Sequence, residues 1–269
     1  MRYSSGFVSA GKLKLHYRKM GHGPKLLIAF HGYGRDGTIF EPLARHLKDV
    51  YTVYAIDLPH HGQSECDESR LEKHDLAALA GHLAREMNVE KISLAGYSLG
   101  GRVCVSMIEV MPRQIDKVVL LASDGLKFNP LHYFLTNTFV GSRLFRNVLT
   151  RPGKYIRFIN WMKDRKWIDA HRHSFAVWYL QTESTRAFLL KVWPCLRKLV
   201  PVPAKVRAAI KKYELPVYVF MGAYDKVIPV KLAQGFKRNL KSVHLYVLQK
   251  GHRVMDSDTL PQITKCLLH

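Results

Sequence analysis

The sequence predicts an α/β fold in which a mostly parallel, twisted sheet carries helices on both faces. Short apolar runs of strand length recur along the chain, at 24–30, 51–56, 91–95, 118–122, 217–221 and 243–248. Several are separated by stretches in which apolar residues have helical spacing, at 39–47, 75–87 and 101–109. Strands that alternate with helices form crossover units, and such units build parallel sheets with helices on both sides.

Two parts of the chain depart from this alternation. Residues 7–18 alternate partly between apolar and polar side chains, so we expect an antiparallel hairpin at one edge of the sheet. Residues 126–213 contain no comparable strand but many aromatic residues, some at helical spacing. We therefore expect residues 1–125 and 214–269 to form the core, and residues 126–213 to form a helical insertion.

The composition is that of an ordinary globular protein whose 269 residues suffice for one sizeable core. The sequence has no apolar run long enough for a membrane helix and no signal peptide at its start, so we expect a cytoplasmic protein. The four cysteines form no CxxC pair and have no histidine at zinc-finger spacing, which argues against a structural metal. We expect neither a metal nor an organic cofactor.

The net charge of +21 is high and unevenly distributed. Residues 126–213 contain 18 lysines and arginines but only three aspartates and glutamates. Such an excess attracts acidic partners, although it is equally typical of a solvated surface. The acidic partners that remain open are an acidic carrier protein, an anionic membrane surface and a negatively charged small substrate. No nucleic-acid-binding module is recognisable, so we expect no specific nucleic-acid binding.

The residues 96–101, Gly-Tyr-Ser-Leu-Gly-Gly, stand between the strand 91–95 and the helix 101–109. A GxSxG pattern at a strand-to-helix turn is a nucleophile elbow, in which a sharp turn exposes the serine hydroxyl at the carboxyl edge of the sheet. The N-terminus of the following helix offers amide donors and a positive dipole end to a developing oxyanion. Ser98 is therefore the candidate nucleophile.

A serine hydroxyl needs a general base, and the base needs an acid that orients it. Asp225 follows the strand 217–221, and His252 follows the strand 243–248. Because parallel strands end at the same edge of a sheet, we expect both residues to converge on Ser98. Asp124, which follows the strand 118–122, is the rival acid.

Together these motifs resemble the α/β-hydrolase superfamily, in the subgroup with a helical cap, and the match covers nearly the whole chain outside the insertion. His31-Gly32-Tyr33-Gly34 is similar to the HGxG loop of that family. The resemblance implies an α/β-hydrolase fold, an oxyanion hole made by the backbone amides of Tyr33 and Leu99, and a cap that roofs the nucleophile. Residues 57–64 resemble the DxPGxGxS turn of the family, with His60 where glycine is usual.

We therefore expect a serine hydrolase that cleaves a carboxylic ester through Ser98, His252 and Asp225 and an acyl-enzyme. The aromatic insertion favours an apolar acyl group, on a small-molecule or acyl-carrier-borne ester. Fold does not determine the reaction, so two other activities remain alternatives to ester cleavage, that of an acyl thioesterase and that of a carbon–carbon bond hydrolase. A receptor or binding protein with the same fold is the non-catalytic alternative.

One motif has a competing interpretation. Residues 32–37 fit the GxGxxG pattern, and Asp57 lies at the end of the next strand, as in a dinucleotide-binding fingerprint. That interpretation leaves His31 and the order Ser, Asp, His unexplained, so we keep it as a minor alternative.

Overall fold

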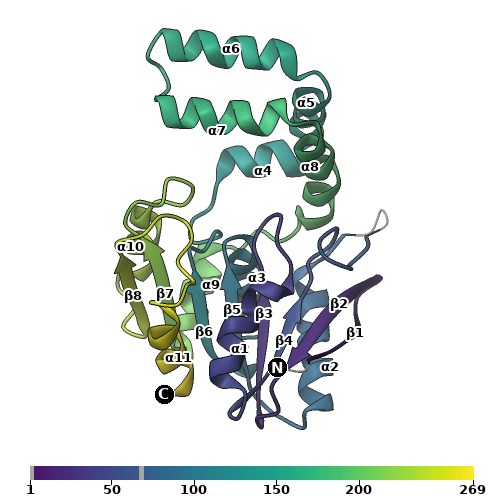
Figure 1. Cartoon of the computed structure of the whole chain (residues 1–269), viewed down its shortest axis with the longest axis vertical. Helices are drawn as coiled ribbons and strands as arrows, with labels where there is room; N and C mark the ends of the chain where they lie inside the picture. The colour runs from purple at the N-terminus through teal and green to yellow at the C-terminus, as the bar shows by residue number, and fades with distance from the viewer. Residues whose placement is uncertain (1–2, 67–69) are drawn as a thin grey trace. The chain divides into compact units, whose positions relative to one another are not determined.

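A computed structural model describes residues 3–66 and 70–269 of the chain (Figure 1). The chain forms two compact units. Unit 1 comprises Met1–Phe128 and Leu199–His269, and unit 2 comprises Asn129–Lys198.

The described part of unit 1 is built on an eight-stranded sheet with the order β1-β2-β4-β3-β5-β6-β7-β8. The first two strands form an antiparallel hairpin that joins β4 antiparallel, and the other neighbours pair in parallel. This confirms the mostly parallel sheet and the edge hairpin. The strands are β1 Tyr3–Ala10, β2 Leu13–Met20, β3 Lys25–Phe30, β4 Tyr51–Ile56, β5 Ile92–Tyr97, β6 Ile115–Leu121, β7 Val217–Gly222 and β8 Val243–Leu248.

Helices cover both faces of this sheet, as expected. The first and last helices, α1 and α11, contact each other on one face, whereas α3 packs against α2 and α9 on the other (Figure 1). The helices of unit 1 are α1 Glu41–Leu47, α2 Lys73–Glu86, α3 Leu99–Val110, α9 Pro203–Lys212, α10 Val230–Lys237 and α11 Leu260–Leu268, with short 3-10 helices at Gly37–Phe40 and Pro112–Gln114.

The apolar runs form strands because side chains on both faces of the sheet are buried. In β3, Leu27 and Ala29 belong to the core under α1 and α11, while Leu26 and Ile28, which alternate with them, are buried toward the opposite face. β3 pairs with both β4 and β5, so the chain changes direction across the sheet at β3. Open α/β sheets bind their ligands outside the carboxyl ends of the strands at such a switch point.

The insertion is shorter in the structure than the predicted range 126–213. Residues 199–213 belong to unit 1, because Val206 and Ile210 of α9 are buried and α9 packs against α3. The helices α10 and α11 were not predicted from the sequence.

Unit 2 consists, in its described elements, of helices. They are α4 Pro130–Asn137, α5 Phe139–Thr150, α6 Pro152–Asp164, α7 Ala170–Gln181 and α8 Glu183–Leu196. Prolines at the first positions of α4 and α6 start these helices without losing an intrahelical bond. Thr138 alone separates α4 from α5, and its hydroxyl accepts the Gly141 N–H at 3.0 Å as an N-cap. No helix among the described residues has both the length and the apolar character needed to cross a membrane.

Candidate active site

Ser98 occupies the turn between β5 and α3 with φ 52° and ψ −112°. Residues with a side chain rarely adopt such a conformation, which costs about 1–3 kcal/mol. The surrounding hydrogen bonds hold it in place. The Ser98 N–H donates to the Leu121 carbonyl of β6 at 2.9 Å, and the Ser98 carbonyl accepts the Asp124 N–H at 3.0 Å. The turn therefore has the strained backbone that a nucleophile elbow requires.

Glycine at position 100 allows the helix after Ser98 to approach the neighbouring strand. A Cβ added to Gly100 would overlap the carbonyl oxygen of Phe30, the last residue of β3. No side chain movement could relieve this overlap, because the obstacle is backbone. The close contact brings the N-terminus of α3 against the loop that follows β3.

The structure brings Ser98, His252 and Asp225 together. The Oγ of Ser98 lies 3.0 Å from Nε2 of His252, and Nδ1 of His252 lies 2.8 Å from Oδ2 of Asp225. These residues follow the carboxyl ends of β5, β8 and β7 respectively. When Nδ1–H donates to the carboxylate, Nε2 presents its lone pair to the serine hydroxyl. The arrangement is thus able to accept the serine proton.

Asp225 is fixed by its own loop. Its Oδ1 accepts the backbone N–H groups of Val227 at 2.8 Å and of Ile228 at 2.9 Å, and the carboxyl group is buried. Both oxygens are therefore engaged, one by the loop and one by His252.

The rival acid, Asp124, has other partners. Its carboxylate pairs with the guanidinium of Arg102 on α3, and it accepts the Gly125 N–H at 2.6 Å. The geometry thus places Asp225, and not Asp124, against Nδ1 of His252.

The loop after β3 lies beside the nucleophile. A Cβ added to Gly32 would come within 3.1 Å of the Ser98 Cβ. Leu99 is the first residue of α3, and the N–H groups of a first helical turn have no partner within their helix. Tyr33 and Leu99 therefore belong to the two segments that flank Ser98. An oxyanion hole formed by their amides stays a prediction.

His31 connects this loop to the turn after β4. Its Nε2 accepts the Leu58 N–H at 2.9 Å, so Nδ1 carries the hydrogen and donates to the Gly32 carbonyl at 2.8 Å. Burial, together with the neighbouring His61, lowers the pKa of His31 to about 4. A neutral imidazole at this position supports the loop next to Ser98.

Asp57 is the centre of a polar cluster that the sequence did not predict. Its fully buried carboxylate accepts hydrogen bonds from His16 Nδ1 at 2.8 Å, Arg18 Nη1 at 2.9 Å and Gly37 N at 2.7 Å. A carboxylate enclosed in this way is not available to a ribose hydroxyl, which removes the acidic residue from the dinucleotide-binding interpretation. The only signal in the sequence is that His16 and Arg18 share one face of β2.

His60, which stands where the related turn usually has glycine, has φ 61°. This is the left-handed region that glycine adopts without strain and that histidine tolerates better than branched residues. His60 thus adopts the type of backbone conformation that glycine favours.

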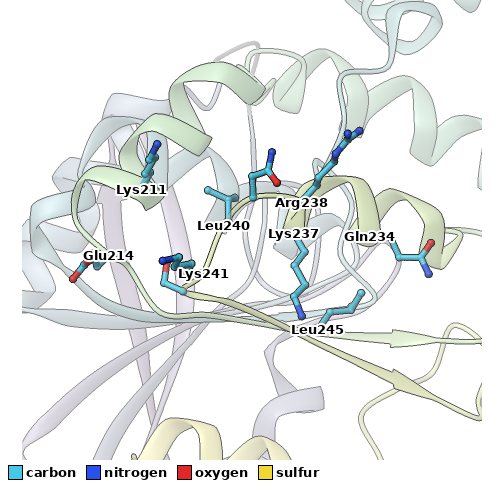
Figure 2. Close-up of a pocket in the computed structure, with 10 residues that line it drawn as sticks. Lys211, Glu214, Gln234, Lys237, Arg238, Leu240, Lys241 and Leu245 are labelled. Atoms are coloured by element: carbon cyan, nitrogen blue, oxygen red, sulfur yellow. The ribbon is translucent and has the colours of Figure 1, made fainter.

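A separate cavity of about 1310 Å³ opens near the amino-terminal ends of β7 and β8 (Figure 2). Four of the ten residues that line it are cationic and one, Glu214, is acidic, and the other five are polar or apolar. Glu214 and Ser242 precede β7 and β8, whereas Asp225 and His252 follow them. Six-residue strands separate the two edges by roughly 20 Å, so this cavity is distinct from the Ser98 site.

Comparisons with known proteins identify relatives that match most of the chain. An uncharacterized hydrolase, YugF, of Bacillus subtilis is 25% identical over 244 residues, covering 89% of this chain and 86% of that protein. A pimeloyl-[acyl-carrier protein] methyl ester esterase of Vibrio campbellii is 24% identical over 250 residues, covering 88% and 90%. A solved structure from work on carboxylesterases of Nitrososphaera gargenis superimposes with a TM-score of 0.67 at 18% identity, covering 98% of both chains. Residues 26–261 match the alpha/beta hydrolase family, and the chain belongs to that family.

Proposed function

We propose that this protein is a serine hydrolase that cleaves a carboxylic ester through Ser98, His252 and Asp225. One observation carries the proposal: His252 is hydrogen-bonded to both other residues, at 3.0 Å to Ser98 Oγ and 2.8 Å to Asp225 Oδ2. A serine that lacked this base would be a poor nucleophile at neutral pH.

In the proposed first step, the Ser98 Oγ attacks the ester carbonyl while its proton moves to Nε2 of His252. The resulting imidazolium is stabilised by the carboxylate of Asp225, which stays ionised. When the tetrahedral intermediate collapses, Nε2 gives the proton to the departing alkoxide, and an acyl group remains on Ser98. Water then attacks this acyl-enzyme with His252 as base, which releases the acid and restores the serine.

The developing oxyanion is the second requirement of this chemistry. We propose that the backbone amides of Tyr33 and Leu99 stabilise it, since these residues flank Ser98 on the loop after β3 and on α3. Donors of this kind contribute about 10²–10³ in rate when they are aimed at the oxyanion. The hydrogen bonds from His31 to Gly32 and from Leu58 to His31 fix the loop after β3, so this loop would need little reorganisation to bind an oxyanion.

The acyl group is proposed from the insertion and from the relatives. The insertion Asn129–Lys198 is rich in aromatic residues, and this content favours an apolar acyl chain. Two relatives are named as pimeloyl-[acyl-carrier protein] methyl ester esterases. We therefore propose to test an ester substrate whose acyl chain is attached to an acidic carrier protein.

The mechanism is tested with p-nitrophenyl esters of increasing chain length and with a fluorophosphonate probe. We expect the wild type to hydrolyse the esters and to be labelled, and Ser98→Ala to do neither. Ser257→Ala, which removes an exposed serine outside the site, serves as the control and should behave as the wild type. Equal turnover or labelling of wild type and Ser98→Ala would refute the proposal.

The class of bond is tested on the same variants. Acyl thioesters and carbon–carbon substrates are compared with the matched oxygen ester at equal chain length. A kcat/KM for the oxygen ester that exceeds the others by tenfold or more supports the ester assignment. A tenfold or greater preference for the thioester would instead identify the protein as an acyl thioesterase.

A further inference from the structure

One side of the helix α6 in unit 2 carries aromatic and cationic residues that face solvent. Lys154, Arg157, Phe158 and Trp161 follow each other at the spacing i, i+3, i+4 and i+7, so they share one face of the helix. The other face carries half-buried side chains, and α6 packs against α5 and α7. No described residue of α6 is buried. The exposed face is therefore not the one that unit 2 uses for its own packing.

The aromatic rings of this face continue beyond the helix. The rings of Phe158 and Trp161 stack at 5.6 Å, and Trp161 meets Trp167 edge to face at 5.0 Å. The guanidinium of Arg165 lies 5.1 Å from the centre of the Trp161 ring. Phe158 is 53% exposed and Trp167 65%. We call the set Lys154, Arg157, Phe158, Trp161, Arg165 and Trp167 the α6 stripe.

Exposed clusters of large apolar rings are unfavourable in water and generally mark an interaction surface. The rings of the α6 stripe are ordered by mutual contacts, so little conformational entropy would be lost when they bind.

The charges of the stripe are unbalanced. Within the described part of the chain, Lys154, Arg157 and Arg165 form no ion pair with an acidic side chain. Unit 2 as a whole contains 13 lysines and arginines but only three aspartates and glutamates. A second copy of the same stripe would bring like charges together, which disfavours self-association through this face. The surface that covers the stripe must instead be anionic and must accept aromatic rings.

We propose that the α6 stripe binds the surface of an anionic lipid membrane. Tryptophan and phenylalanine insert at the boundary between headgroups and acyl chains, and lysine and arginine contact the anionic headgroups from the same side of a helix. The helix α6 lies along the surface in this arrangement and does not cross the bilayer. The proposal is independent of the reaction at Ser98 and goes beyond the proposed function.

The test is sedimentation of the full chain with vesicles that contain phosphatidylglycerol in phosphatidylcholine, compared with phosphatidylcholine alone. We expect binding to the anionic vesicles at physiological salt and at least tenfold weaker binding to the neutral ones. The double variant Phe158→Ser/Trp167→Ser should lose at least tenfold in partition coefficient. The matched control Phe139→Ser/Trp178→Ser removes one phenylalanine, 79% exposed, and one tryptophan, 57% exposed, elsewhere on unit 2 and should bind as the wild type.

Two further measurements separate the alternatives. Charge removal by Lys154→Gln/Arg157→Gln should weaken binding to anionic vesicles, while Lys12→Gln/Lys48→Gln in unit 1 should not. Ser98→Ala should bind vesicles as the wild type does, so that failure of the catalytic proposal leaves this one intact.

Three results would overturn the proposal. The first is equal vesicle binding by the stripe variant and its matched control. The second is no binding of the wild type to anionic vesicles, which would leave an acidic protein as the occupant of the stripe. The third is a dimer in solution that only the stripe variant disrupts, which would make the occupant a second copy of the chain.

Discussion

The backbone N–H of Leu58 donates a hydrogen bond of 2.9 Å to Nε2 of His31, across 27 positions of the sequence. This bond exists only while Nε2 has a free lone pair, that is, while the imidazole is neutral. Because Nδ1 of the same ring donates to Gly32, the neutral histidine joins the loop beside Ser98 to the turn after β4. Protonation of Nε2 would direct a second hydrogen against the Leu58 N–H.

The folded protein should therefore lose stability in mild acid. The pKa of His31 falls from 6.5 to about 4 on folding, so between these values the unfolded chain binds the proton and the folded chain does not. The stability that depends on neutral His31 is complete above pH 6.5 and decreases as the pH falls toward 4. The full shift corresponds to about 3 kcal/mol. Urea unfolding between pH 7.5 and 4.5 measures it.

The variant His31→Gln should show a shallower dependence of the unfolding free energy on pH than the wild type. The dependence will not vanish, because burial also lowers the pKa of His61. His46→Gln, which replaces an exposed histidine of α1, is the control and should keep the wild-type slope. An identical slope in His31→Gln and wild type would show that His31 does not cause the effect.

Replacement of Asp225 by asparagine should reduce kcat of ester hydrolysis by about 10³–10⁴, with a much smaller effect on KM. The amide would leave His252 without the negative charge that stabilises its protonated form and would favour the wrong tautomer. Asp124→Asn is the matched control, since it removes the rival carboxylate and its pair with Arg102. It should reduce kcat by less than about tenfold. A larger loss in Asp124→Asn than in Asp225→Asn would reverse the assignment of the acid.

The sheet was predictable from the sequence because its central strands are buried on both faces. Residues 51–56, for example, include no charged side chain and are all buried, which is typical of parallel strands. The convergence of residues 98, 225 and 252 followed from the same reasoning, because residues after parallel strands meet at one edge. For Ser98, the strained φ of 52° is also implied by the glycines around it.

Other features depend on contacts between distant segments and were not predictable in this way. Val206 and Ile210 of α9 have the spacing of any amphipathic helix, which does not say whether the helix packs on the sheet or inside the insertion. The helices α10 and α11 are only eight and nine residues long, so each offers few turns over which a helical pattern can be recognised. The pairing of Arg18 with Asp57 joins residues that no local pattern connects.

Gly100→Ala should strongly destabilise the fold. Its Cβ would overlap the Phe30 carbonyl, and relief requires that α3 move away from β3, which we expect to cost at least about 3 kcal/mol. The matched control is Gly235→Ala in α10, where an added Cβ meets nothing within 4 Å. That change should stabilise the protein by up to about 1 kcal/mol, because alanine is the better helix former. Thermal unfolding of both variants measures the difference, and equal melting temperatures would contradict it.

Asp57→Asn should destabilise the protein by about 3–5 kcal/mol, because it removes the buried carboxylate that pairs with Arg18 at 2.9 Å and leaves only the more exposed Asp36, 4.0 Å away, to balance the buried guanidinium. Asp49→Asn breaks an exposed pair with His22 and should cost less than about 1 kcal/mol. The cause is separated from a general loss of packing by adding Arg18→Met to Asp57→Asn. If the uncompensated charge is responsible, the double variant should be more stable than Asp57→Asn alone. A double variant less stable than Asp57→Asn, measured by urea unfolding at pH 7.5, would show instead that Arg18 stabilises the β2 edge through its other contacts.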